Sequence, residues 1–492
     1  MKLAELMKRL PGAELIGDPG LEIAAVTHDS RRSGAGTLFV GIRGLVTDGN
    51  DFIDAARKKG AVAVCSEEVP RGEGTWVRVG DARKALALLS AAVLGDPARS
   101  LDLVGVTGTN GKTTTTYLID SALRAAGETV GLVGTVEYRV GNRIAEAVRT
   151  TPEASELQAL FREMVDASCR RAVLEVSSHS LALQRVHGLE FRVAVFTNLT
   201  RDHLDFHGDM DAYFAAKRKL FDSLLRPDGH AIVNLDDDRA EELARVSRGT
   251  LWSYSLDNPK ADLYAEELRL GLDRTRFRAR TPKGVLEIES SLVGRFNVQN
   301  VLAALGAGLA LGLAPDAVQR GIATLPGVPG RMEKVALGQD FTVLVDYAHT
   351  DDALRNLLET VRGLGPRRVI TLFGCGGDRD RSKRPLMGAV ASRLSDIVIL
   401  TSDNPRSEPP EAILEEIRRG IPASRAEDTL VIPDRRDAIV RALEMGREGV
   451  VVVIAGKGHE TYQVLRDRSV PFDDRQVARD ALARLAGAGG KR

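Results

Sequence analysis

The 492-residue chain has few cysteines, no net charge and no long apolar run. Its three cysteines, Cys65, Cys169 and Cys375, are odd in number and far apart, which argues against a disulfide framework and against a zinc cluster. The 68 basic residues balance the 68 acidic residues, and this balance argues against a protein that coats nucleic acid. The longest apolar runs, such as Val450 to Ala455, are too short to span a bilayer.

The first ten residues also lack the apolar stretch of a secretory signal, and their pattern is that of a short amphipathic helix. The sequence has no short-period repeat, and its low-complexity residues are confined to the tail at 486–492. We therefore expect a cytoplasmic protein without a membrane partner. The length of 492 residues indicates about three domains.

Strand-like and helix-like segments alternate along the chain in three blocks. Residues 1–98 end in a turn-like sequence, residues 99–330 end in a linker with two prolines, and residues 331–492 begin with a new strand. Because strands that alternate with helices are typical of parallel sheets, the sequence predicts three α/β domains with these boundaries. The expected strands include 37–42, 61–66, 101–106, 171–176, 193–198, 341–345, 369–373, 397–401 and 450–454, and the expected helices include 52–59, 213–221 and 298–313.

The glycine-rich segment 105–116 carries the clearest functional signal, because it follows an expected strand and precedes a helical pattern. Gly108 and Gly111 let the backbone approach phosphate oxygens, and the start of the helix offers unpaired N–H groups. Lys112 can reach the terminal phosphates of a nucleotide, and the Thr113 hydroxyl can ligate Mg²⁺. An ordinary strand-to-helix turn is the alternative. The lysine and the threonines after it favour a phosphate-binding loop, so we expect the chain to bind ATP.

Two further polar clusters follow expected strands of the same block. The first, Glu175 to Ser180, offers a carboxylate, hydroxyls and an imidazole that can hold Mg²⁺ and a polar ligand. A helix start capped by Ser177 or Ser178 is the alternative, but a phosphate loop needs a metal partner. The second, Thr197 to Gly208, contains two histidines and two aspartates. Because it has no cysteine and its carboxylates favour a hard ion, we expect Mg²⁺ binding or nucleotide contact, with a solvated loop as the alternative.

Three expected strands of the last block end in glycine-rich or charged segments, at 373–385, 402–406 and 456–460. Ligands of parallel sheets bind at such strand ends. The side chains presented there are Arg379, Asp403, Asn404, Arg406 and Glu460. Arginine binds carboxylates in a bidentate fork, whereas carboxylates bind amines. The set therefore fits a zwitterionic ligand, and a surface network of ion pairs is the alternative.

The order and context of these motifs resemble the Mur ligase family over essentially all 492 residues. The resemblance depends on the segments 108–114, 175–179, 198–207, 294–300, 330–333, 346–349, 403–406 and 456–460. It implies an N-terminal domain for a UDP-sugar, a central ATPase domain with a mainly parallel sheet, and a Rossmann-like C-terminal domain that closes over an amino acid. The resemblance also implies a monomer.

The family resemblance implies a reaction in which ATP, with Mg²⁺, phosphorylates the D-glutamate γ-carboxylate of UDP-N-acetylmuramoyl-L-alanyl-D-glutamate. The amine of an incoming amino acid then attacks the acyl phosphate, and a peptidoglycan precursor gains one residue. The Asp-Asn-Pro-Arg form of 403–406 matters most for the choice of amino acid. Arg406 can fork onto the second carboxylate of meso-2,6-diaminopimelate, which lysine lacks, so the match favours diaminopimelate.

The resemblance assigns residues of this sequence to each ligand. The implied ATP-binding residues are Gly108, Thr109, Asn110, Gly111, Lys112, Thr113, Thr114, Asn300, Arg331 and Asp346. The implied UDP-substrate residues are Ser30, Leu45, Val46, Thr47, Thr150, Thr151, Ser177 and Arg185. The implied diaminopimelate residues are Arg379, Asp403, Asn404, Pro405, Arg406, Gly456 and Glu460. The implied catalytic residues are Lys112, Glu175, His203 and Lys217, and the implied metal ligands are Thr113, Glu175, His203 and Lys217 as a carbamate.

Lys217 shows how the resemblance changes an interpretation. On local pattern alone, Lys217, Arg218 and Lys219 form the charged face of an amphipathic helix. In the family, the lysine at this Ala-Ala-Lys position is carbamylated. A carbamate converts a cation into a carboxylate-like ligand that can position a second Mg²⁺.

The sequence departs from the family pattern at one helix start. Two rival functions are also weighed against the ligase interpretation. Asp351 stands where proline is common in the family, which can alter a helix start but removes no implied ligand. A binding module that uses the nucleotide only as a switch would need neither Glu175 nor Lys217. A ligase for lysine or alanyl-alanine, or a folylpolyglutamate-type ligase, is the second rival, and 403–406 together with Ser30 argue against it.

Overall fold

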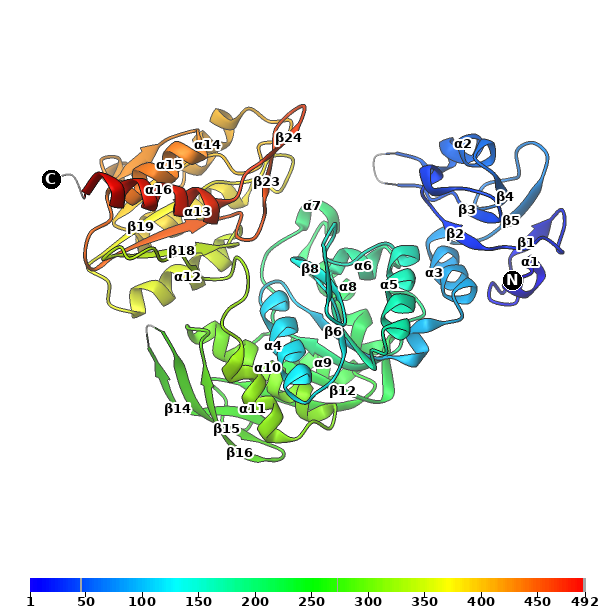
Figure 1. Cartoon of the computed structure of the whole chain (residues 1–492), viewed down its shortest axis with the longest axis horizontal. Coiled ribbons are helices and arrows are strands. Elements are labelled where there is room, and N and C mark those ends of the chain that lie inside the picture. The colour runs from blue at the N-terminus through cyan, green and yellow to red at the C-terminus, as the bar shows by residue number, and fades with distance from the viewer. Residues whose placement is uncertain (45–46, 272, 490–492) are drawn as a thin grey trace.

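The computed structural model describes residues 1–44, 47–271 and 273–489, and it shows three α/β domains, as the sequence predicts (Figure 1). Their sheets take strands from residues 14–78, 102–290 and 333–455. The exact boundaries after residues 98 and 330 stay predictions. None of the described helices is long and apolar enough to cross a membrane.

The N-terminal domain contains a five-stranded sheet of order β1-β5-β4-β3-β2, which is parallel except at β1. The short N-terminal helix expected from the sequence is α1, and the strand expected at 61–66 coincides with β4. The strands are β1 (Glu14–Ile16), β2 (Ala25–Thr27), β3 (Thr37–Val40), β4 (Ala61–Ser66) and β5 (Thr75–Arg78), and the helices are α1 (Leu3–Met7), α2 (Ile53–Lys58) and α3 (Ala82–Val93).

The central domain contains an eleven-stranded sheet of order β16-β15-β14-β13-β12-β11-β6-β10-β7-β8-β9. The strands are β6 (Asp102–Thr107), β7 (Val130–Val133), β8 (Glu137–Val140), β9 (Arg143–Glu146), β10 (Arg171–Glu175), β11 (Phe191–Phe196), β12 (Leu225–Asn234), β13 (Thr250–Ser255), β14 (Leu263–Leu270), β15 (Thr275–Thr281) and β16 (Gly284–Ser290). The helices are α4 (Lys112–Ala125), α5 (Ala154–Asp166), α6 (Ser178–Ala182), α7 (Leu204–His207), α8 (Met210–Asp222), α9 (Ala240–Val246), α10 (Arg295–Ala310) and α11 (Pro315–Thr324).

Both edges of the central sheet are antiparallel ribbons that the sequence did not predict. The strands β7, β8 and β9 form one ribbon, and β14, β15 and β16 form the other. Along Thr275–Thr281, buried residues alternate with arginines that are exposed or half-buried. This alternation is that of a half-solvated strand, and its many charges hide it from a search for apolar runs.

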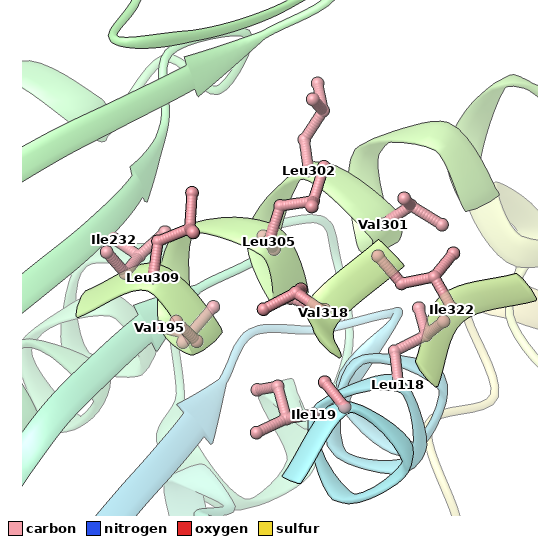
Figure 2. Close-up of a cluster of buried hydrophobic side chains, with 14 of the residues drawn as sticks. Leu118, Ile119, Val195, Ile232, Val301, Leu302, Leu305, Leu309, Val318 and Ile322 are labelled. Atoms are coloured by element: carbon pink, nitrogen blue, oxygen red, sulfur yellow. The ribbon is translucent and has the colours of Figure 1, made fainter. Parts of the chain in front are cut away.

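Helix α10 forms the centre of the larger core cluster, where it packs between α4, α11 and the sheet (Figure 2). Its hydrophobic side chains are buried almost all round, as expected of a helix rich in Ala, Leu and Gly. The labelled side chains are Leu118 and Ile119 of α4, Val195 of β11, Ile232 of β12, Val301, Leu302, Leu305 and Leu309 of α10, and Val318 and Ile322 of α11. Each fully buried side chain of this size contributes about 1.5–3 kcal/mol. This core fixes α4, and with it the phosphate loop that opens α4.

The C-terminal domain has a six-stranded sheet of order β17-β18-β22-β19-β20-β21, parallel from β18 to β21, with a separate β23–β24 hairpin. The strands are β17 (Glu333–Lys334), β18 (Thr342–Asp346), β19 (Arg368–Phe373), β20 (Ile397–Leu400), β21 (Thr429–Val431), β22 (Val450–Ala455), β23 (Tyr462–Val464) and β24 (Ser469–Pro471). The helices are α12 (Asp351–Gly363), α13 (Lys383–Leu394), α14 (Pro410–Arg418), α15 (Arg435–Glu444) and α16 (Asp474–Gly489).

Each of the three domains carries one buried free cysteine. Cys65 lies on β4, Cys169 lies just before β10, and Cys375 follows β19. No two of them share a sheet, so the sequence argument against a disulfide framework holds in the structure.

Candidate active site

The strand order explains why the polar clusters of the central domain meet. Strand β6 lies between β10 and β11, and all three are parallel. Their carboxyl ends therefore open at one edge of the sheet, where β6 leads to the phosphate loop, β10 to residues 175–180, and β11 to residues 197–208.

The phosphate loop is held in a conformation that only glycine allows at two positions. Gly108 has φ +150° and Gly111 has φ +87°. A Cβ atom on Gly108 would lie 1.9 Å from Thr197 Oγ1, and one on Gly111 would lie 2.4 Å from Asn300 Oδ1. Lys112 curls back over the loop, and its Nζ donates to the carbonyls of Gly108 and Thr109 at 3.0 and 2.8 Å. These contacts hold the loop in a single conformation.

Glu175 is fully buried beside this loop. Its Oε2 accepts hydrogen bonds from the hydroxyls of Thr113 (3.1 Å) and Thr135 (3.0 Å), and its Oε1 accepts one from the Thr135 N–H (2.8 Å). Arg331 completes the chain of contacts, since its Nη2 donates to Thr113 Oγ1 at 3.0 Å. The carboxylate, the threonine hydroxyl and the linker arginine therefore form one connected group.

Lys217 is 1% exposed, so the charged face expected from local pattern is wrong for this residue. Its Nζ donates to the Gly108 carbonyl at 2.7 Å and lies 4.4 Å from the centre of the Tyr213 ring. Burial, and then the positive charge of Lys112, hold the pKa of Lys217 well below its ordinary value. A neutral amine is the form that reacts with CO₂ to give a carbamate. The site therefore favours the chemistry that the family resemblance implies.

Asp202 and His203 lie beside the phosphate loop. Burial alone would raise the pKa of Asp202, but His203, His349 and Lys383 outweigh burial and lower it. Burial lowers the pKa of His203, so its imidazole is neutral and can coordinate a metal. Sequence reasoning singled out His203 but not Asp202, although Asp202 stands next to it in the same cluster.

Predicted site residues of the central and C-terminal domains line one cavity of about 960 Å³. The predicted residues that line it are Thr109, Asn110, Gly111, Lys112, Thr113, Thr114, Thr150, Thr151, Glu175, Ser177, Arg185, His203, Asn300, Arg331, Asp346 and Arg379. Those that do not line it are Gly108, Lys217, Ser30, Thr47, Asp403, Asn404, Pro405, Arg406, Gly456 and Glu460. Leu45 and Val46 lie outside the described residues.

The UDP-substrate residues of the central domain share one wall of this cavity. Thr151 Oγ1 donates to the Glu175 carbonyl at 2.7 Å, and Arg185 Nη1 donates to the Thr151 carbonyl at 3.1 Å. The Ser177 hydroxyl accepts a hydrogen bond from the Ser180 N–H at 3.1 Å, so Ser177 also caps α6, the alternative that the sequence left open. Ser30 and Thr47 belong to the N-terminal domain.

The predicted diaminopimelate residues of the C-terminal domain meet for the same topological reason as the central clusters. Strand β19 lies between β22 and β20. The carboxyl end of β19 leads to residues 374–379, that of β20 to residues 401–406, and that of β22 to residues 456–460. The Gly377 N–H donates to the Asn404 carbonyl at 2.9 Å, and Arg406 Nη1 donates to the Gly377 carbonyl at 2.8 Å. Arg406 has φ +52°, an unusual value for arginine, and burial followed by the charge of Arg379 lowers its pKa.

Arg201 connects the two clusters. Its Nη1 donates to Asp380 Oδ2 at 2.8 Å and to Ser382 Oγ at 2.9 Å, and its Nη2 donates to Asp351 Oδ1 at 2.8 Å. Asn110 of the phosphate loop also donates to Asp352 Oδ2 at 3.0 Å. Asp351, which stands where proline is common in the family, is the first residue of α12 and also binds the central domain through Arg201. We define Arg201, Asp351, Asp380 and Ser382 as the interdomain clamp.

Family models match all three domains of the chain. They are the Mur ligase family catalytic domain at residues 22–93, the Mur ligase middle domain at 106–308 and the Mur ligase glutamate ligase domain at 330–458. The phosphate loop, its buried glutamate and the arginine-rich third domain thus lie within a known architecture, and the chain belongs to the Mur ligase family. It is an ATP-dependent ligase of that family.

Individual relatives show which members of the family the chain resembles. The chain is 52% identical over 469 residues to the UDP-N-acetylmuramoyl-L-alanyl-D-glutamate–2,6-diaminopimelate ligase of Solibacter usitatus, covering 94% of each chain. It is 47% identical over 485 residues to the protein of the same name from Syntrophomonas wolfei, covering 98% of this chain and 99% of the relative. A solved structure of a ligase with this name matches with a TM-score of 0.70 and 34% identity over 99% of both chains. A MurF structure from Acinetobacter baumannii, 20% identical with a TM-score of 0.68 over 92% of this chain and 95% of that chain, shares the fold.

Proposed function

We propose that the protein joins meso-2,6-diaminopimelate to the D-glutamate γ-carboxylate of UDP-N-acetylmuramoyl-L-alanyl-D-glutamate at the expense of ATP. One observation carries the proposal: a single cavity is lined by the phosphate loop, by Thr150, Thr151 and Arg185 on the UDP-substrate side, and by Arg379 of the amino-acid domain. Relatives of the same name at 52% and 47% identity support this reaction. Cytoplasmic location and a monomeric state belong to the proposal.

The phosphate loop positions ATP for transfer. Lys112 and the N–H groups at the start of α4 would bind the phosphates and orient ATP for transfer to the substrate carboxylate. An oxygen of that carboxylate forms a bond to the γ-phosphorus while the bond to ADP breaks. The amine of the amino acid then forms the C–N bond, inorganic phosphate leaves, and the amine loses a proton.

The residues beside the loop fit Mg²⁺. Thr113 Oγ1 and Glu175 Oε2 are oxygen donors 3.1 Å apart, which suits a hard cation, and both residues line the cavity. Among the described residues no three His, Cys, Asp or Glu side chains gather as a complete metal site, so ATP oxygens would supply further ligands. His203 and carbamylated Lys217 are the other proposed ligands. When bound, Mg²⁺ neutralises charge on the transferred phosphoryl group.

The choice of amino acid depends on residues 403–406. Arg406 would bind the second carboxylate of diaminopimelate, and the carboxylates of Asp403 and Glu460 would bind the neighbouring amine. L-Lysine has the amine but not the carboxylate, so it would leave Arg406 without a partner.

The decisive experiment measures phosphate release from ATP and Mg²⁺ in the presence of UDP-N-acetylmuramoyl-L-alanyl-D-glutamate. Meso-diaminopimelate and L-lysine are supplied in parallel reactions. We expect release with diaminopimelate only. Release with lysine only would keep the ligase and overturn the proposed amino acid, and no release with either would overturn the proposed function.

A further inference from the structure

Lys457 is a fully buried cation that the family resemblance did not assign to any ligand. It lies in the loop after β22, beside the proposed amino-acid residues. Its Nζ donates to Glu460 Oε2 at 2.9 Å and to Asn404 Oδ1 at 3.2 Å, and it lies 3.7 Å from Asp403 Oδ1. One ammonium group therefore contacts three of the side chains that the proposal gives to the amino acid.

These contacts fix the orientation of the Asn404 amide. Its oxygen accepts from Lys457 Nζ and from the Val464 N–H at 2.9 Å, while its Nδ2 donates to Glu460 Oε2 at 2.9 Å. Turning the amide over would place its NH₂ group against the Lys457 ammonium and its oxygen against the Glu460 carboxylate, so neither contact would be a hydrogen bond. Lys457, together with the Val464 N–H and Glu460, thus holds the Asn404 amide in one orientation.

Asp403 is left with a free acceptor in this arrangement. Asp403 is 7% exposed, and its Oδ1 is buried without a hydrogen-bond partner among the described residues. A buried carboxylate oxygen without a donor is unusual and marks a place for one. The ammonium of an incoming amino acid is such a donor, and Lys457, 3.7 Å away, is too far to replace it.

We propose that Lys457 is a positioning residue that sets the preference for a zwitterionic amino-acid side chain. The inference rests on the proposed function. With Lys457 present, the pair of Asp403 and Glu460 together with Lys457 carries a net charge of −1 and suits one ammonium, while Arg406 takes the carboxylate. Without Lys457, the same pair carries −2, which repels the second carboxylate of diaminopimelate but still attracts the side-chain ammonium of lysine.

The test compares Lys457→Met with the wild type in phosphate release, varying diaminopimelate, L-lysine and ATP in turn. We expect KM for diaminopimelate to rise about tenfold or more, as for loss of a charged hydrogen-bond network. We expect KM for ATP to stay within about twofold, because the phosphate loop lies in another domain. The ratio of kcat/KM for diaminopimelate to that for lysine should fall.

Lys334→Met is the matched control, since Lys334 lies on β17 of the same domain with a side chain 58% exposed. It should leave all three constants unchanged. Lys457→Gln is the second variant, because it keeps a donor for Glu460 without the charge, and it should also lower the selectivity ratio.

The outcomes separate this inference from the proposed function. An inactive wild type overturns the proposed function and the inference with it. An active wild type together with unchanged diaminopimelate KM and unchanged selectivity in Lys457→Met overturns the inference alone. If Lys457→Met is poorly folded, as shown by a lower thermal midpoint and weaker ATP binding, the Lys457→Gln result decides: wild-type selectivity in that variant overturns the inference.

Discussion

The phosphate loop of the central domain and the loop after β22 of the C-terminal domain bind their lysines in opposite ways. Within the described residues, Lys112 and Lys217 donate to backbone carbonyls and form no ion pair with a carboxylate. In the C-terminal domain, by contrast, the buried Lys457 is paired with carboxylates, since its Nζ lies 2.9 Å from Glu460 Oε2 and 3.7 Å from Asp403 Oδ1. Two buried arginines on helices of this domain are paired as well. Arg384 binds Glu408 at 2.8 Å, and Arg435 binds Asp474 at 2.7 Å.

The difference indicates how each site recognises its ligand. Lys112, bonded only to carbonyls, keeps its donors for an anion, so charge dominates binding at the phosphate loop. Loops in which a lysine is already paired with carboxylates gain less from charge alone, and the geometry of their donors and acceptors then adds to the discrimination. The first site is therefore expected to depend on net charge, and the second on the identity of single side chains.

The largest effect is expected where the buried lysine beside the phosphate loop is removed. Lys217→Ala should lower kcat by about 10²–10³-fold, since it removes the proposed carbamate ligand and its electrostatic role. Bicarbonate should not rescue this variant, because alanine has no amine to carbamylate. Lys219→Ala, on the same helix but only half-buried, is the control. Full activity of Lys217→Ala in steady-state phosphate release would refute the carbamate role.

A smaller but more selective effect is expected in the amino-acid loops. Arg406→Ala should raise KM for diaminopimelate by about 10–100-fold, because the second carboxylate loses a charge-assisted partner. KM for ATP should not change. Steady-state kinetics with each substrate varied in turn measures both constants. Equal losses for the two ligands would show that Arg406 supports the whole domain rather than one ligand.

The interdomain clamp ties the two sites together, so its removal tests whether they act as one. Arg201→Ala breaks partly buried ion pairs, whose free energies lie between those of exposed and of buried pairs. We expect about a tenfold loss of kcat. Small-angle X-ray scattering should show a larger average radius of gyration. Arg226→Ala, which removes exposed ion pairs within the central domain, should change neither quantity. Unchanged kcat in Arg201→Ala would mean that the clamp does not couple the sites.

The smallest effect concerns the paired charges of the C-terminal domain. Hydrogen bonds from Arg384, opposed by partial burial, lower the pKa of Glu408 from 4.5 to about 2. The stabilisation is therefore fully present above pH 4.5 and is lost as the pH falls toward about 2. Glu408→Gln should lower the free energy of unfolding by about 1–2 kcal/mol at pH 7. Urea denaturation of both proteins should show a difference that shrinks below pH 4.5; a difference independent of pH would contradict the assignment.

The parts of the fold that the sequence predicts are those with local signals. A strand, a glycine turn and a helix start lie within residues 101–116, so the phosphate loop is visible without a structure. The strand expected at 61–66 coincides with β4, because its apolar run is bounded by glycine and by charged residues. Helix α10 was expected at 298–313 and spans Arg295–Ala310, an error at the ends only.

The parts that escaped prediction depend on contacts between distant segments. Lys217 has charged neighbours in the sequence and is buried only because α8 packs under the phosphate loop. The clamp joins Arg201 to Asp380, which lie 179 residues apart. Lys457 contacts Asn404 because the segments that follow β22 and β20 lie close together. No periodicity or motif in one segment carries such information.

The three buried cysteines give each domain its own reporter of local opening. Burial raises the pKa of Cys65 and of Cys375 to about 12, and it also raises the pKa of Cys169. Thiols in this state are almost inert, so each reacts with a labelling reagent mainly when its own domain opens. Mass spectrometry after labelling would therefore resolve the opening free energies of the N-terminal, central and C-terminal domains in the unmodified protein. A bound nucleotide should slow labelling most at the cysteine of the domain that it stabilises.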